Sequence, residues 1–398
     1  MSDDYDLVCL SHLRWSFVYQ RPQHLLSRCA RERRVFFLEE PVFSAGPNHL
    51  ELTKTDEGVF VAVPHIEVGT QPEAIDKLQT EMLRGLLASE KIERFVLWYY
   101  TPMALPIADG LSPLAIVYDC MDQLSAFRGA PPALIERERQ LLEKADVVFT
   151  GGHALYEEKH CLHSNIHPFP SSVDVPHFAC ARAPQPDPED QATISGPRLG
   201  FFGVIDERMD LELLAGVAQA RPDWQLVILG PVVKISEDEL PRLANIHYLG
   251  SKTYRELPRY IAGWDAALLP FARNESTKFI SPTKTPEYLA AGKPVISTSI
   301  KDVVRPYFQL GLVRIADTVG TFVAACEDAL AEPAAARLAA ADSFLADLSW
   351  DKTWQEMAAH VKAVLSARRR GEASRRMTLV RASWRPADAE QLAAAGGK

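Results

Sequence analysis

The stretch Ser281–Thr298, SPTKTPEYLAAGKPVIST, decides how this chain folds. It predicts a short helix over residues 286–291, because Thr285 can cap a helix and the proline after it suits the first helical position. Gly292 suits the residue after the helix, and the next proline prevents continuation. A buried strand then begins at residues 295–296. Loop, helix and strand therefore follow one another within eighteen residues.

The start of this predicted helix carries the chemistry of the stretch. Lys284 lies beside it, Glu287 falls in its first turn, and Ser281 and Thr285 belong to the same loop and cap. Free backbone N–H groups at a helix start can hold a phosphate, while a carboxylate accepts hydrogen bonds from a sugar diol. The alternative is that Glu287 only complements the helix dipole, which contributes about 0.3–1 kcal/mol.

Length and composition bound the class of protein. A chain of 398 residues exceeds one ordinary core, so we expect two domains. Apolar residues make up 47% and charged residues 24%, as in globular proteins. The polar, acidic first residues do not read as a secretory signal, and six cysteines without a C-x-x-C pair are typical of a reducing compartment. We therefore expect a cytoplasmic protein.

Charge is distributed unevenly along the chain. The net charge of −9 argues against a nucleic-acid partner. Residues 362–385 reverse this sign, with eight basic residues against the single acid Glu372. We expect them to contact an anionic membrane surface, at the inner face of the membrane. The alternative is a solvated helix end followed by a flexible tail.

Apolar runs alternate with amphipathic segments, which predicts α/β domains with doubly wound parallel sheets. In the first domain we expect strands over residues 6–10, 35–38, 59–63, 95–99, 115–118 and 146–150, and helices over 73–87 and 134–144. The second domain should contain strands at 198–203, 225–230, 246–250 and 265–270, and later helices at about 319–331 and 333–346. The expected division is a first domain over 1–180, a linker over 181–197, a second domain over 198–349, a helix over 350–370 and a basic tail over 371–398.

The loop after the first predicted strand is a candidate acceptor site. His12, Arg14, Trp15 and Arg21 lie in or at the end of it, and ligands bind at the carboxyl ends of strands in open α/β sheets. Basic and aromatic side chains there suit a sugar or a lipid phosphate. Packing between the domains is the alternative.

Three side chains are candidates for catalysis: Asp119, Asp122 and His12. The two aspartates follow a predicted strand, and a carboxylate within hydrogen-bond reach of a hydroxyl can take its proton. Capping of the next helix is the alternative. A histidine cluster at residues 160–167 crosses a helix end and a loop, and nothing in it fixes a tetrahedral metal site, so no metal is expected.

The segment PTKTPEYLAAGKPVIST and the earlier RPQHL resemble bacterial glycosyltransferases of the GT-B fold, in particular family 4 and the teichuronic-acid-type enzymes. The resemblance implies two Rossmann-like domains facing a cleft, with the acceptor on the first and a nucleotide-sugar on the second. It also implies that Glu287 binds the ribose hydroxyls of the donor. Residues around Gly250 would then meet the nucleobase through backbone atoms.

The chain departs from this family in two places. At the loop after Gly203, where the family offers an arginine and a lysine to the donor diphosphate, Val204 occupies the usual arginine position and Arg208 is the nearest substitute. Eight positions before Glu287, where family 4 members commonly carry a first glutamate, this chain has Phe279. The stereochemistry of transfer is therefore left open.

The motifs present and absent favour one function. There is no G-x-G-x-x-G and no G-x-x-x-x-G-K-[ST], and the one D-x-D precedes the first strand. We therefore expect metal-independent transfer of a sugar from a nucleotide-sugar, a substrate rather than a cofactor, to a glycan or lipid-linked acceptor in cell-envelope polysaccharide synthesis. The alternatives are a nucleotide-sugar 2-epimerase and a non-catalytic nucleotide-sugar binding or scaffold protein.

Overall fold

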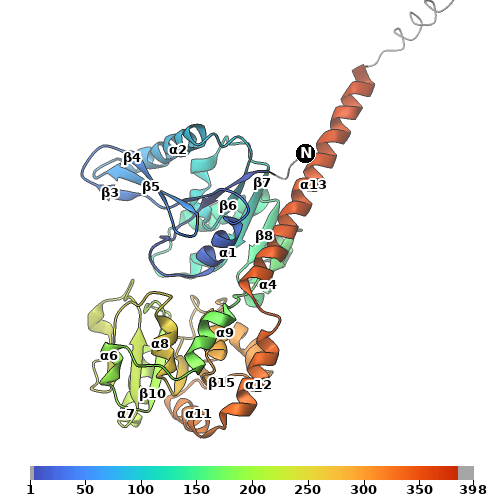
Figure 1. The fold of residues 1–398 in the computed structure, drawn as a ribbon. Coiled ribbons are helices and arrows are strands. Elements are labelled where there is room, and N and C mark those ends of the chain that lie inside the picture. Colours follow the sequence, from blue (N-terminus) through green and yellow to red (C-terminus); the bar gives the residue numbers. More distant parts are fainter. Residues whose placement is uncertain (1–3, 384–398) are drawn as a thin grey trace, which may run out of the picture.

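The computed structural model describes residues 4–383, with side chains as far as Gly371. It contains two domains, each built on its own parallel sheet (Figure 1). The prediction of a two-domain α/β fold is confirmed.

The first sheet has the strand order β3-β5-β2-β1-β6-β7-β8-β9, with β4 paired to the outside of β5. Its pairings are parallel apart from the antiparallel hairpin of β4 and β5. The strands are β1 (Asp6–Leu10), β2 (Val35–Leu38), β3 (Val42–Ser44), β4 (His49–Lys54), β5 (Phe60–Glu67), β6 (Phe95–Tyr99), β7 (Ala115–Cys120), β8 (Val147–Thr150) and β9 (Ile166–Pro168).

Helices cover both faces of this sheet, which explains why its central strands are mostly apolar and buried. Leu83 and Leu141 bring α2 and α3 against one face, and Leu25 and Trp354 bring α1 and α13 against the other. The helices of this domain are α1 (Arg21–Cys29), α2 (Pro72–Ser89), α3 (Ala133–Lys144) and α4 (His153–Lys159).

The second sheet is parallel and has the order β12-β11-β10-β13-β14-β15. Its strands are β10 (Arg198–Phe202), β11 (Gln225–Leu229), β12 (Ile246–Tyr248), β13 (Ala266–Leu269), β14 (Val295–Ser297) and β15 (Arg314–Ile315). The helices that pack with it are α5 (Val175–Ala179), α6 (Glu189–Ala192), α7 (Leu211–Ala220), α8 (Leu257–Ala262), α9 (Lys284–Ala290), α10 (Lys301–Val303), α11 (Val319–Ala331) and α12 (Ala334–Leu345).

The segment expected as a linker, 181–197, packs on the second domain. The Asp187 carboxylate pairs with Arg198 at 2.7 Å, and the Trp264 indole N–H donates to Gln191 at 3.0 Å. Val173 already belongs to the second core, so the chain changes domain before residue 180.

The last helix, α13 (Trp350–Ser383), leaves the second domain and runs along the first (Figure 1). Trp350, Trp354 and Met357 are buried in the core of the first domain, so α13 ties the two domains together. It continues past the expected end at residue 370. The side chains after Gly371, and all of residues 384–398, lie outside the described part of the chain, so the membrane contact expected of the tail stays a prediction. No helix within residues 4–383 is both long and apolar enough to cross a membrane.

Direct contacts join the two domains near the organising stretch. The Ser171 hydroxyl donates to the carbonyl of Ser281 at 3.0 Å, and Asp302 accepts a hydrogen bond from the amide of Ala154 at 2.8 Å. The ring of Tyr19 stacks on that of Tyr254 with centroids 4.6 Å apart. These contacts hold the carboxyl edges of the two sheets beside each other.

Candidate active site at the domain junction

The organising helix begins earlier than the sequence predicts. Helix α9 starts at Lys284, and Thr283 stands at its N-cap, so the prediction that Thr285 caps the helix is wrong. Thr283 already has helical backbone angles, and the amide of Thr285 donates to the carbonyl of Pro282 at 3.1 Å. Few backbone N–H groups near Thr285 are therefore free for a phosphate. Gly292, with φ of +75°, follows the helix as predicted.

Glu287 and Lys284 are the two charged side chains that α9 places at the junction. Glu287 is 4% exposed, yet within residues 4–383 its carboxylate accepts no hydrogen bond and forms no ion pair. Burial raises the pKa of Glu287, and the Lys284 ammonium partly counteracts this. Burial and the Arg208 guanidinium lower the pKa of Lys284. Lys284 is half-buried, and its ammonium lies 5.6 Å from the centre of the Phe201 ring. A buried carboxyl group that has no ion pair beside such a cation is available to a ligand.

Two glycines let Lys284 lie across the ends of β10 and β11. Gly203 has φ of +136°, and a Cβ on it would lie 2.1 Å from Cε of Lys284. A Cβ on Gly230 would lie 1.9 Å from the carbonyl oxygen of Gly203. Gly250 accepts a hydrogen bond from the Gly230 amide at 2.9 Å. The predicted residues Gly203 and Gly250 thus follow β10 and β12, on either side of β11, and Gly203 lies beside the lysine.

Arg208 reaches the same region but already has a partner. Its guanidinium binds both carboxylate oxygens of Asp206, with the shortest distance 2.7 Å. It also lies over the ring of Phe127, from the first domain, at 5.4 Å. Because Asp206 neutralises it, Arg208 offers a phosphate less positive charge than a free arginine would.

Lys234 is a cation of the site that sequence reasoning missed. The amide of Val233 donates to the Ile205 carbonyl at 2.9 Å, which brings Lys234 beside the 204–208 loop. Its ammonium lies 4.6 Å from the centre of the Phe127 ring, and one carboxylate, that of Glu207, lies 3.9 Å away. Nothing in the local sequence signals this role, because Lys234 reaches the site through a turn with φ of +64°.

Asp122 and His12 approach the same place from the first domain. Burial raises the pKa of Asp122 to about 6, although Arg208 lowers it. Its carboxylate has no hydrogen-bond partner among the described residues. Burial and then Lys234 lower the pKa of His12 to about 4, and its Nδ1 is buried without a partner in the same part of the chain. At neutral pH this gives a free carboxylate and a neutral imidazole.

Asp119 and Arg21 do not belong to this site. The two side chains are 0% and 3% exposed and pair at 2.9 Å in the interior of the first domain. The Arg21 guanidinium also donates a hydrogen bond to the Phe169 carbonyl at 2.7 Å. The predicted roles, Asp119 as a base and Arg21 as an acceptor contact, are contradicted because neither side chain can reach a ligand.

Arg14 and Trp15 anchor their loop to the strand beside it. Arg14 pairs with Glu39 at 3.0 Å, and the Trp15 amide donates to the same carboxylate at 2.8 Å. The Trp15 ring packs edge-on against Phe37 at 5.1 Å. Both residues shape the edge of the first domain, and their contact with an acceptor stays a prediction.

The position of the family's first glutamate offers no carboxylate. Phe279 packs against the core of the first domain, and Glu275, the nearest acid before it, has an 81% exposed side chain that faces Lys278. Among residues 4–383, no group of three or more His, Cys, Asp or Glu side chains is arranged to hold a metal ion.

Two parallel-sheet domains tied by a returning helix, with the carboxyl edges of both sheets at one junction, define the GT-B class of fold. Residues 196–332 match the family glycosyl transferases group 1. The matched part of the chain contains α9 and the loops around Gly203 and Lys234, so the candidate donor residues lie inside the region that is similar to this family.

A curated relative extends the match beyond this domain. The chain is 28% identical over 265 residues to TuaH of Bacillus subtilis (strain 168), which carries a provisional description as a teichuronic acid biosynthesis glycosyltransferase. The alignment covers 62% of this chain and 66% of the relative, just short of two thirds of its length. Together with the family match, it supports a transferase.

Solved structures share the fold over nearly the whole chain. A sucrose-phosphate synthase from Thermosynechococcus elongatus superposes with a TM-score of 0.68 at 14% identity, over 91% of this chain and 100% of the other. An E. coli trehalose-6-phosphate structure with bound UDP-2-fluoro glucose gives 0.63 at 13%, over 90% and 99%. Anabaena Alr3699/HepE, in complex with UDP and glucose, gives 0.61 at 12%, over 90% and 100%. At these identities the likeness establishes the GT-B fold alone.

Proposed function

We propose that this chain transfers a sugar from a nucleotide-sugar donor to a hydroxyl of a glycan or lipid-linked acceptor, without a metal ion, in the synthesis of a surface polysaccharide. One observation carries the proposal. Glu287 and Lys284 are an unpaired carboxylate and an unpaired ammonium at the edge of the second sheet, inside the region that is similar to group 1 glycosyltransferases.

Each charged group of the site has a part in this reaction. The Glu287 carboxylate accepts hydrogen bonds from the ribose diol, and Lys284 and Arg208 balance the donor diphosphate. The diphosphate leaves as the bond from the sugar carbon to its oxygen breaks, while the acceptor oxygen bonds to that carbon. Asp122, ionised above a pKa of about 6, takes the acceptor proton.

The sugar and the base of the donor are chosen from the neighbours for the first test. Two structures of the same fold hold UDP or a UDP-sugar, so uridine donors come first, followed by GDP-, dTDP- and ADP-sugars. The Bacillus relative supports an envelope polysaccharide as the product.

The test is ligand-induced stabilisation of the native chain and of Glu287→Ala. At about one hundred times its dissociation constant a donor should stabilise the native chain by about 2.7 kcal/mol. Glu287→Ala should lose this effect, whereas Glu275→Ala, whose side chain is 81% exposed, should keep it. No stabilisation by any donor, or an equal response of Glu287→Ala, would overturn the donor site.

Phe279 favours one further candidate, a non-catalytic nucleotide-sugar binding protein, since it stands where the family commonly carries its first glutamate. Such a protein would be stabilised by a donor but would never release a nucleoside diphosphate. An epimerase would release an altered sugar without an acceptor. Following free nucleotide and free sugar over time, with and without an acceptor glycan, separates the three functions.

A further inference from the structure

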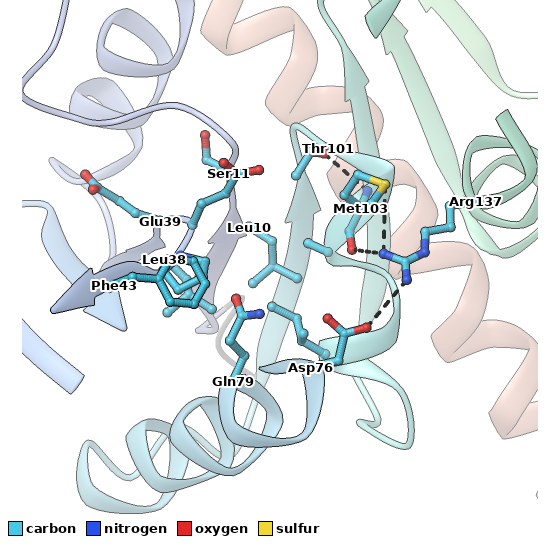
Figure 2. A pocket seen from close by; sticks show the side chains of 14 residues that line it. Leu10, Ser11, Leu38, Glu39, Phe43, Asp76, Gln79, Thr101, Met103 and Arg137 are labelled. Atoms are coloured by element: carbon cyan, nitrogen blue, oxygen red, sulfur yellow. Dashed lines mark hydrogen bonds and ion pairs between the residues drawn. The ribbon is translucent and has the colours of Figure 1, made fainter. Parts of the chain in front are cut away.

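A pocket of about 270 Å³ lies in the first domain, at the point where the sheet changes direction (Figure 2). In the strand order β5-β2-β1-β6-β7, the strands that follow β1 in the sequence lie on one side of it. The strands that follow β6 lie on the other side. Ser11 follows β1, Glu39 follows β2 and Thr101 follows β6, and all three line the pocket. Ligands of open α/β sheets bind at such switch points.

An unsatisfied amide faces this pocket. Gln79 on α2 is only 8% exposed, lines the pocket, and has no side-chain hydrogen bond with any residue of the described chain. Figure 2 shows its amide pointing into the cavity. Water in the cavity can reach this amide, so a ligand that enters the cavity can take its hydrogen bonds without displacing a protein partner.

The charges of the lining cancel or are negative. The Arg137 guanidinium is held by the Met103 carbonyl at 2.9 Å and by Asp76 at 3.5 Å (Figure 2). Glu39 is occupied by Arg14, and Glu40 also lines the pocket. Among the described residues that line the pocket there is therefore no free cation for a phosphate, and the carboxylates would repel one.

The other groups suit the hydroxyls and the apolar face of a sugar ring. The hydroxyls of Ser11 and Thr101 each accept a backbone N–H, at 3.0 and 3.2 Å, and keep their own proton to donate. Phe43 is 51% exposed and forms a wall of the pocket (Figure 2). The volume lies near the lower limit of about 300 Å³ for small-molecule pockets, so one sugar ring fits better than an oligosaccharide.

We propose that this pocket binds one uncharged sugar ring through Gln79 and Phe43, and that it selects a neutral glycan terminus over a sugar phosphate or a lipid phosphate. The inference rests on the proposed function for its role as the acceptor subsite. Ser11 and Thr101 place the pocket next to His12, which directly follows Ser11. Arg14, Trp15 and Arg21, predicted as acceptor contacts, do not line it.

The experiment measures saturation-transfer NMR of free ligands on the full chain. The probes are methyl glycosides of glucose, galactose, mannose and N-acetylglucosamine, each paired with its 6-phosphate. We expect at least one glycoside to bind and the matched phosphate to bind more weakly. Gln79→Leu and Phe43→Ala should each weaken the binding of that glycoside by about 2- to 10-fold.

Phe308→Ala is the matched control, because Phe308 is a similarly exposed phenylalanine, at 48%, in the second domain. It should leave glycoside binding unchanged. Since Phe43 is half exposed, its removal tests the pocket even if Gln79→Leu folds poorly.

Three results would overturn the proposal: binding of no glycoside, preference for the phosphates, or unchanged affinity in Phe43→Ala. Donor stabilisation is measured separately on the same proteins. A chain that binds glycosides in this pocket but no nucleotide-sugar would refute the proposed function and leave the pocket standing. A chain that binds a nucleotide-sugar but no glycoside would refute the proposal for the pocket alone.

Discussion

Two acid–base pairs lie at the carboxyl edges of the two sheets, and they differ in one respect. In the first domain Arg21 and Asp119 touch, with 2.9 Å between nitrogen and oxygen. In the second domain Lys284 and Glu287 lie close enough to influence each other's pKa but form no ion pair. Both pairs are largely removed from water, so burial alone does not separate a structural pair from a functional one.

The difference teaches where a ligand can bind. Arg21 and Asp119 satisfy each other, so replacing one leaves a buried charge without a partner. Lys284 and Glu287 remain available, and a ligand that carries both a diol and a diphosphate can satisfy them together. An unpaired polar group at a cavity or a domain junction is therefore a better indicator of a site than burial alone, and Gln79 in the first domain is a second example.

The largest expected effect comes from breaking the satisfied pair. Asp119→Ala should destabilise the chain by about 3–5 kcal/mol, because Arg21 is left buried and uncompensated. Asp109→Ala removes the partner of Lys144 in an exposed pair of the same domain, and it should cost less than about 1 kcal/mol. Urea unfolding followed by circular dichroism measures both. A loss of unfolding free energy below about 1 kcal/mol for Asp119→Ala would mean that Arg21 does not need Asp119 as a partner. The difference between this pair and Lys284–Glu287 would then disappear.

A smaller effect should follow from the titration of Asp122. Its pKa is raised from 3.8 to about 6, so the folded chain holds this proton more tightly than the unfolded chain does. Its contribution to stability is therefore complete at low pH and is lost as the pH rises from about 3.8 through about 6. Asp122→Asn keeps a neutral side chain at every pH and should lack this loss.

The measurement is the unfolding midpoint of the native chain and of Asp122→Asn between pH 5 and pH 8. The unfolding midpoint of the native chain should rise relative to that of the variant as the pH falls through about 6. The turnover rate of the native chain should fall over the same pH range, since the protonated acid cannot accept a proton. A midpoint difference that is independent of pH would show that the Asp122 carboxylate is not withdrawn from water at the domain junction.

The sequence predicts the buried elements well, because apolar runs and helix caps are local. Strand β1 and helix α11 have the predicted bounds, 6–10 and 319–331. Strands β3 and β4 were missed, since β4 is largely exposed and belongs to an antiparallel hairpin at the sheet edge. Such a strand lacks the continuous apolar run that marks a central parallel strand.

The site was predictable only in part, for a physical reason. Glu287 and Lys284 follow from a local motif, and they lie at the junction. The pairing of Asp119 with Arg21 joins positions 98 residues apart, so it depends on the packing of α1 against β7. The approach of Lys234 to Phe127 depends on the docking of two domains. Gln79 lies on an amphipathic helix, where a polar residue ordinarily faces solvent.

Lys234 resembles neither of the two compared pairs. Its side chain is 43% exposed and has one carboxylate at 3.9 Å, so it is paired less closely than Arg21 and is more exposed than the half-buried Lys284. If Lys234 supplies the charge that Val204 lacks, Lys234→Gln should weaken the binding of UDP by about 1.4- to 5-fold, because an exposed ion pair contributes about 0.2–1 kcal/mol. Uridine, which carries no phosphate, should bind both proteins equally.

Isothermal titration of UDP and uridine at two salt concentrations measures this effect. The difference between native chain and variant should shrink at the higher salt, since salt screens a partly exposed charge. Lys301→Gln is the matched control, because Lys301 is 44% exposed and pairs with Glu157 instead. Equal affinity of native chain and Lys234→Gln for UDP would mean that Lys234 serves only the contact with Phe127. The diphosphate would then depend on Lys284 and Arg208, and partial exposure would count against a role in binding.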